Sequence, residues 1–242
     1  MATHYTTQGF VFKKKDRADA DRIFSVFTND FGRIEIFAKS IRAIASKLKG
    51  GIEVFCVSDI EFIQGKNHKT LTSALLTEKF SNMVTVPEKM EVFAKVACLL
   101  DDFIKEQETD QNVYNLVINF FKTLNACLLP TSGYRLMYYY FFWNFASIMG
   151  YKPELFKCAH CSLGLDSANL YFSNKEGGII CKSCFLKLGN AKEINADVVK
   201  ILRLFLKNDW QTMLKLKIQS ASYKLLQEIS DNYGNYLSGI LA

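Results

Sequence analysis

The first eighty residues alternate between apolar and polar positions with the two-residue period of β-strands. The clearest case is the segment 33–39, where Ile34, Ile36 and Ala38 are expected to face a core and the intervening residues to face outward. The pattern predicts strands over residues 8–13, 21–29, 33–39, 51–60 (continued or turned over 59–64) and 71–79, the last being either a strand or the start of a helix. Five short strands in this length are typical of a small closed barrel such as the OB-fold.

From Pro87 onward the apolar period becomes that of α-helices. Helices are predicted over residues 87–105, 112–129, 133–149, 198–207 and about 217–237. The third is apolar on most sides, which predicts a position at the centre of a bundle. Asn195 or Asp197 is expected to cap the fourth. The fold class is therefore α+β, with a barrel at 1–80 and a helical domain at 81–242 that carries an insertion at about 156–188.

The first predicted helix also gives expectations for single positions. Its inward face is expected to hold the apolar residues spaced at helical intervals, namely Met90, Phe93, Ala94, Ala97 and Leu100. Asp101 and Asp102 are adjacent, and adjacent helical residues diverge by about 100°. The two carboxylates are therefore not expected to share a site, and a solvated helix face is the expected place for both.

Two CxxC pairs lie inside the predicted insertion. Cys158 and Cys161 form the first pair, and Cys181 and Cys184 follow after nineteen intervening residues. This spacing is typical of a structural zinc site, because two thiolates on a tight turn can reach one ion and a second turn completes a tetrahedron. The intervening segment has Tyr171-Phe172 and Gly177-Gly178, and it predicts two short strands around a turn.

Two alternatives to a four-thiolate site remain open at this point. The cysteines can pair as two disulfides, and His160, inside the first pair, can replace a thiolate as a ligand. We expect His160 to face solvent, because four thiolates already fill the shell. A closed shell of four sulfur ligands leaves no position for substrate, so the Zn²⁺ is expected to be structural and not catalytic.

The other three cysteines, Cys56, Cys98 and Cys127, stand alone in apolar surroundings and are expected to be small buried hydrophobic residues. An odd number of cysteines without an export signal predicts a reducing, cytoplasmic location. The longest apolar run, 136–150, is too short to span a bilayer. No membrane association is expected.

Positive charge gathers in one part of the predicted barrel. The chain of 242 residues has a net charge of +6, and the segment 33–49 carries five cations against one acid. These cations lie where a strand runs into a loop, and OB-folds bind ligands on such faces and loops. We therefore predict a nucleic-acid-binding surface made of Arg33, Lys39, Arg42, Lys47 and Lys49. A solvated loop is the alternative. Phe37 is expected either to stack on a base or to pack under a loop.

Catalytic motifs are not apparent. The chain has three histidines, His4, His68 and His160, and none lies in a recognisable nucleophile motif. Gly50-Gly51 is not part of a phosphate-binding GxxxxGK[ST] loop. The sequence therefore predicts a binding protein and not an enzyme.

Several of these segments resemble the bacterial recombination mediator family RecO. The resemblance rests on the runs at 32–39, 46–50 and 52–55, on Gly150 to Leu155 leading into Cys158, and on the order of barrel, helices and zinc ribbon. It covers essentially the whole chain. The aromatic run 138–142 departs from the family's usual leucine-rich run, which bears on the exact form of a partner pocket there but not on the fold.

The resemblance implies a function without turnover. Members of the family bind single- and double-stranded DNA, anneal complementary strands, and work with RecR to help load RecA on strands coated by SSB. The five cations at 33–49 match the family's DNA-binding positions. The resemblance also implies an SSB C-terminal tail site on the helical domain, for which Arg135 is the candidate, and an association with the nucleoid.

Two other functions remain open. In one, the chain is a zinc-stabilised protein–protein adaptor whose basic loop binds acidic peptides without DNA. In the other, it is an enzyme that uses the zinc as a catalytic ion. Binding of a single-stranded oligonucleotide separates the first from a DNA-binding role, and a metal shell other than four sulfurs favours the second.

Overall fold

The computed structural model describes residues 3–104, 109–207 and 209–241. The chain divides into two compact units, Met1–Leu129 and Pro130–Ala242, which are described separately below. Over its described residues, the first holds the strands of the predicted barrel, a 3₁₀ helix at Ser81–Met83 and two α-helices. The second holds the remaining helices and the cysteine-containing insertion.

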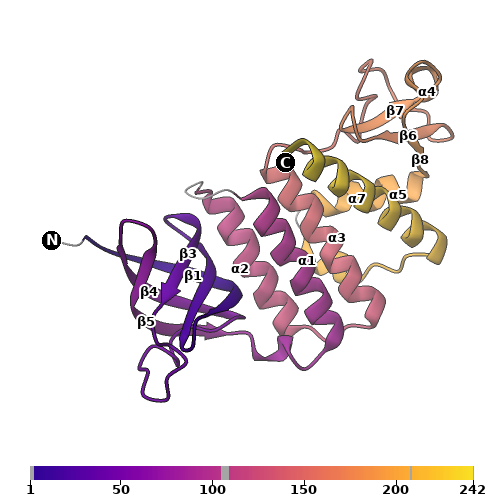
Figure 1. The fold of residues 1–242 in the computed structure, drawn as a ribbon. Coiled ribbons are helices and arrows are strands. Elements are labelled where there is room, and N and C mark those ends of the chain that lie inside the picture. Colours follow the sequence, from indigo (N-terminus) through magenta and orange to yellow (C-terminus); the bar gives the residue numbers. More distant parts are fainter. Residues whose placement is uncertain (1–2, 105–108, 208, 242) are drawn as a thin grey trace. The chain divides into compact units, whose positions relative to one another are not determined.

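Five strands of the first unit form a closed barrel in the order β1-β2-β3-β5-β4 (Figure 1). All neighbours are antiparallel except β3 and β5, which pair in parallel over two residues at the start of β5. The predicted barrel is thus confirmed. Its strands are β1 (His4–Arg17), β2 (Asp21–Thr28), β3 (Gly32–Ala38), β4 (Cys56–Gln64) and β5 (Lys69–Lys79).

The burial of β3 follows the predicted alternation. Ile34, Ile36 and Ala38 are fully buried in the barrel core, whereas Glu35 is exposed. The strand begins at Gly32, whose φ of +61° follows the turn at residues 29–31. The segment 71–79 is a strand and not the start of a helix.

One strand begins later than its sequence predicts. The apolar alternation of 51–55 suggested a strand, but β4 begins at Cys56. Gly51 ends a turn closed by a hydrogen bond from its N–H to the Leu48 carbonyl (3.1 Å). Phe55 has a positive φ of +68°, which lies outside the β region. Ile52 is nevertheless buried, so its apolar character reflects core packing within a loop.

The segment 39–55, which connects β3 to β4, is called the basic loop below (Figure 1). It carries buried or partly buried apolar side chains that pack on the barrel core, Ile41, Leu48, Ile52 and Val54. A side chain on Gly51 would place its Cβ 1.9 Å from the Ala74 carbonyl oxygen, so the loop touches the backbone of β5 there. The loop is therefore packed and not a free extension.

Two α-helices follow the barrel in the described part of the first unit. Helix α1 (Pro87–Phe103) has proline at its first position, where the missing N–H costs no hydrogen bond. Helix α2 (Gln111–Ala126) is capped by the Asp110 carboxylate. The predicted start of α1 is confirmed, and the predicted end at residue 105 lies outside the described residues. The rings of Phe10 and Phe121 stack at 4.6 Å and join the barrel to α2.

The predicted inward face of α1 is partly wrong. Phe93 and Leu100 are buried, but Met90 and Ala94 are exposed. Val92, Val96 and Leu99 are buried instead, so the buried stripe is rotated about the helix axis relative to the predicted one. Cys98 is exposed, contrary to expectation, while Cys56 is buried as expected and Cys127 is half-buried.

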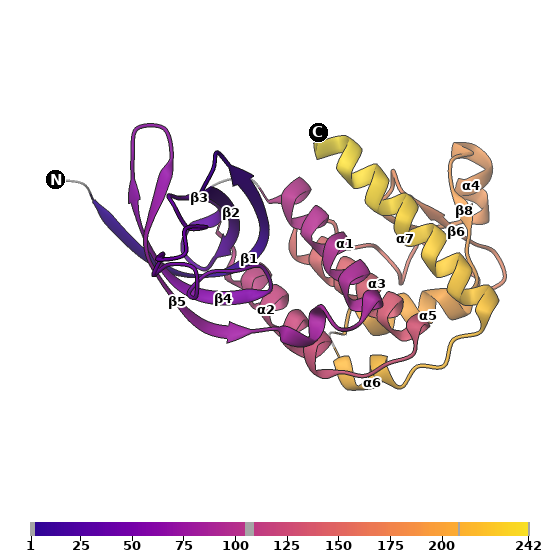
Figure 2. The ribbon, with the colours of Figure 1, turned by 60° about the horizontal axis from the view of Figure 1, so that its bottom comes forward.

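The second unit is built around α3 (Thr131–Ile148), as its all-round apolar sequence predicts. This helix packs against α5, α6 and α7 (Figure 2). The Trp143 indole donates to Ser230 Oγ at 2.9 Å, and the Asn144 amide donates to the Phe205 carbonyl at 3.0 Å. The neighbouring helices are α5 (Ala196–Phe205), α6 (Trp210–Leu214) and α7 (Ser220–Leu241).

The helix ends in this unit follow the sequence closely. Asn195, rather than Asp197, caps α5, since its side-chain oxygen accepts from the Val198 N–H. Gly150 follows α3 at φ +91°, a conformation that favours glycine. The short helix α6 was not predicted, and five residues give too few apolar repeats to reveal one. In the described part of the chain, no helix is both long enough and apolar enough to cross a membrane.

Candidate metal centre and candidate nucleic-acid surface

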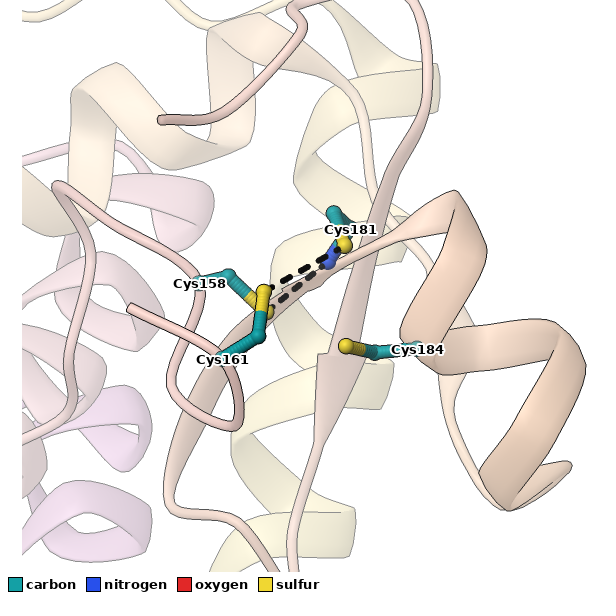
Figure 3. Close-up of side chains that lie close together, drawn as sticks. All are labelled: Cys158, Cys161, Cys181 and Cys184. Carbon is teal, nitrogen blue, oxygen red and sulfur yellow. Dashed lines mark hydrogen bonds between the residues drawn. The ribbon is translucent and has the colours of Figure 1, made fainter. Parts of the chain in front are cut away.

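The four cysteines of the two CxxC pairs converge on one point (Figure 3). Their sulfur atoms all lie within 4.8 Å of one another, and Cys161 Sγ lies 3.9 Å from Cys181 Sγ. Cys158 and Cys184 are buried, while Cys161 and Cys181 are half-buried. These residues are positioned to bind a metal ion, as the spacing predicts.

Short β structure brings the two pairs together. Strands β6 (Leu170–Ser173) and β7 (Gly178–Cys181) form the predicted hairpin, and β7 ends at Cys181. Cys184 lies in the first turn of α4 (Lys182–Leu188). A third strand, β8 (Lys192–Glu193), pairs with β6 and was not predicted from its two polar residues. The Ala159 N–H donates to the Ile179 carbonyl at 2.7 Å, which fixes the first pair beside β7.

Backbone N–H groups point at the sulfur of Cys158. Burial opposes its ionisation, but backbone N–H groups of Cys161, Cys181 and His160 outweigh this and lower the pKa of Cys158 to about 6. The pKa of Cys184 rises to about 12, because burial and hydrogen bonds among the four thiols favour its protonated form. A bound cation would replace the shared protons of this cluster.

The structure contains neither disulfides between these cysteines nor His160 in a ligand position. All four cysteines are free thiols, so no disulfide joins them. His160 lies outside the sulfur cluster, and its Nδ1 is 3.0 Å from Glu176 Oε2. A set of four thiolates is the donor chemistry of a closed, tetrahedral Zn²⁺ site.

The five predicted DNA-binding cations fall into two groups. Arg33 and Arg42 are ion-paired. Arg33 contacts Asp101 through Nη2 at 2.8 Å and Nε at 2.9 Å. Arg42 contacts Asp16 at 2.8 Å, and it also donates to the backbone carbonyls of Ala18 and Asp19.

The second group comprises Lys39, Lys47 and Lys49. All three are exposed, and over the described residues no hydrogen bond or ion pair joins them to another side chain. They lie on the basic loop, which its apolar anchors hold against the barrel. Phe37 is half-buried and its ring lies 5.0 Å from that of His68, so it packs against the β4–β5 hairpin.

Asp101 was missed as a contact of the basic segment. It was expected on a solvated face of α1, but its side chain is only 21% exposed and also pairs with Lys13. Asp102 is exposed, as expected. No sequence signal distinguishes the two acids, because the partners of Asp101 lie on strands far away in the chain.

Arg135, the candidate contact for a partner peptide, lies exposed in the first turns of α3.

Comparison with known proteins supplies the family. A family model described as Recombination protein O N terminal matches residues 1–80, and one described as Recombination protein O C terminal matches residues 89–240. The second match alone covers more than half of the chain. The chain belongs to the RecO family. Membership in the RecO family supports a role in DNA repair and recombination.

Individual relatives agree with the family models. A protein named DNA repair protein RecO from Dehalococcoides mccartyi is 32% identical over 214 residues, which cover 88% of this chain and 83% of the relative. Proteins of the same name from Alkaliphilus metalliredigens and a Thermoanaerobacter species are 27% and 25% identical, and each alignment covers 94% of this chain.

The two family models divide the chain between residues 80 and 89, whereas the compact units divide after residue 129. The boundary near residue 80 stays a prediction.

Proposed function

We propose that this protein is a non-catalytic DNA-binding recombination mediator that anneals single strands. The observation that carries the proposal is the exposure of Lys39, Lys47 and Lys49 on the basic loop. Among the described residues, no side chain forms an ion pair with any of the three. Flexible lysines bind phosphates without reading bases. A loop already packed on a barrel presents them at little cost in conformational entropy.

The two arginines have a different role in this proposal. Arg33 and Arg42 are engaged with Asp101 and Asp16, so they position the barrel and the loop. We propose the three lysines as the main phosphate contacts of the five predicted cations. Family membership supports the DNA-binding proposal as a whole, since the relative from Dehalococcoides mccartyi is named a DNA repair protein.

The ion bound by the four cysteines is proposed to be Zn²⁺ in a structural role. Four thiolates fill a tetrahedral shell, and the Zn²⁺ would hold the β6–β7 hairpin and α4 together. No catalytic role is assigned to the ion. Metal analysis of the purified protein tests this assignment, and a metal other than zinc would contradict it.

The proposed partners follow from the family. They are single- and double-stranded DNA, RecR and the SSB C-terminal tail, with a functional link to RecA loading on SSB-coated strands and an association with the nucleoid. Arg135 is proposed as a contact for the SSB tail. An Arg135→Ala variant should weaken capture of an SSB-tail peptide, with Lys122→Ala on α2 as the control of equal charge change.

Fluorescence anisotropy with a labelled single-stranded oligonucleotide tests the DNA-binding proposal. Binding should weaken steeply as salt rises, because each neutralised phosphate releases counterions. Annealing of complementary SSB-coated strands should accelerate in the presence of the protein. The adaptor alternative predicts instead that an acidic peptide binds the basic loop while the oligonucleotide does not bind.

A further inference from the structure

Ile44 is the most exposed large apolar side chain in the described part of the chain. It is 102% exposed relative to an extended reference, compared with 67% for Leu75 on the outside of the same barrel. It occupies the first central position of a turn closed by the Ser46 N–H and the Ala43 carbonyl at 3.1 Å. Its neighbours Ala43 and Ala45 are exposed and small, so the Ile44 side chain stands alone at the apex of the turn.

The turn is held in place from both sides. Ile41 and Ile52 are each 2% exposed and belong to the barrel core. The Arg42 N–H donates to the Ala20 carbonyl at 2.9 Å, and the Arg42 guanidinium contacts Asp16. A second turn, closed by the Ala43 N–H and the Ser40 carbonyl at 3.1 Å, precedes the apex. These contacts restrain the backbone of the turn that carries Ile44.

The charged residues on the same loop as Ile44 limit the class of ligand that it can contact. Lys39, Lys47 and Lys49 lie within five residues of it on the same loop, and all three are exposed. An exposed apolar side chain on a loop that also carries three exposed lysines fits a polyanion that has flat apolar faces at regular intervals. A nucleic-acid strand has this chemistry, with phosphates along one side and bases along the other.

We propose that Ile44 inserts as a wedge between neighbouring bases of a single DNA strand whose phosphates contact Lys39, Lys47 and Lys49. Isoleucine is among the side chains that proteins insert between base steps. A single strand unstacks at lower cost than a duplex, because no base pairs are strained. Separated bases would remain available for pairing with a complementary strand. This inference rests on the proposed DNA-binding function.

The test uses a single-stranded oligonucleotide that carries 2-aminopurine between two adenines. Stacking quenches this base analogue, so insertion of Ile44 should raise its fluorescence. Ile44→Ala should abolish most of that rise and weaken binding by about fivefold, the effect of losing part of a buried isoleucine. Ile44→Phe should keep or increase the rise. Leu75→Ala is the matched control and should behave as the unmodified protein.

The outcomes separate the wedge from the proposed function. If Ile44→Ala retains full fluorescence and affinity while loss of the three lysines abolishes binding, the wedge is wrong and DNA binding stands. If no variant and no unmodified protein binds the oligonucleotide, the proposed function fails and the wedge fails with it. A larger fluorescence rise in duplex than in single-stranded probe, or an equal effect of Leu75→Ala, also overturns the wedge.

Discussion

Arg33 and Asp101, which are 68 positions apart in the chain, form a two-point contact between β3 and α1. Asp101 Oδ1 accepts from Arg33 Nη2 at 2.8 Å and from Nε at 2.9 Å, while Oδ2 pairs with Lys13 on β1. One carboxylate therefore ties two barrel strands to a helix. This contact neutralises much of the charge of Arg33, whereas no ion pair among the described residues engages Lys39, Lys47 or Lys49 of the basic loop.

A double-mutant cycle measures this contact. Arg33→Ala and Asp101→Ala should each destabilise the protein, and together they should show a coupling energy of about 1 kcal/mol, since both side chains are about one-fifth exposed. Urea denaturation of the four proteins gives the value. Asp197→Ala and Lys200→Ala, an exposed pair within α5, form the control cycle and should show weaker coupling. Additive effects of the Arg33 and Asp101 changes would contradict the proposed fastening role.

The contact between Asp16 and Arg42 predicts a dependence on pH. Hydrogen bonds from Arg22 and then Arg42 hold the pKa of Asp16 below its ordinary value of 3.8. A lowered pKa means that the pairing stabilises the fold fully above the unfolded-state pKa and is lost as the pH falls through the folded-state pKa. Asp16→Asn should therefore lower Tm at pH 7, and the difference from the unmodified protein should shrink below about pH 4. A difference that stays constant down to pH 2.5 would exclude this origin.

Adjacent glycines in the basic loop should respond differently to the same change. A Cβ at Gly51 would lie 1.9 Å from the Ala74 carbonyl oxygen, whereas one at Gly50 would meet nothing within 4 Å. Gly51→Ala should therefore cost about 1–3 kcal/mol as the loop moves away from β5. Gly50→Ala should change stability by less than about 0.5 kcal/mol. Equal stability of the two variants in denaturant titrations would show that the loop does not pack on β5.

Local patterns predicted the elements that depend on neighbouring residues. The alternation at 33–39 gave the buried face of β3, and the apolar run around Trp143 gave the central helix of the second unit. The two CxxC pairs gave the metal centre, because ligand spacing alone constrains it. In each case the residues that form the pattern belong to a single strand, helix or hairpin.

Contacts between distant segments escaped prediction. Nothing near Asp101 distinguishes it from Asp102, and only the folded barrel brings Lys13 and Arg33 to it. The segment 52–55 looks like a strand because its alternating apolar residues Ile52 and Val54 pack on the barrel core from a loop. Cys98 was expected to be buried because its sequence neighbours are apolar, but it lies on the side of α1 away from the buried Val92, Val96 and Leu99.

Metal removal should destabilise the cysteine-containing segment. The free energy of binding a structural ion contributes directly to folding, so Cys181→Ser should abolish stoichiometric zinc and lower Tm by on the order of 10 °C. His160→Ala is the control, because His160 contacts Glu176 and not the sulfur cluster. Zinc content by mass spectrometry and Tm by calorimetry check both. An unchanged Tm after complete chelation would contradict a structural role.

The salt dependence of single-strand binding tests the role of the basic loop most directly. The unmodified protein is compared with Lys39→Ala/Lys47→Ala/Lys49→Ala and with a control of equal charge change, Lys187→Ala/Lys207→Ala/Lys224→Ala. The loop variant should bind weakly, and its slope of log K against log salt should fall by about 2, the loss of three phosphate contacts. The control should keep the original slope. Equal slopes in all three proteins, or equal losses in both variants, would contradict DNA binding by the basic loop.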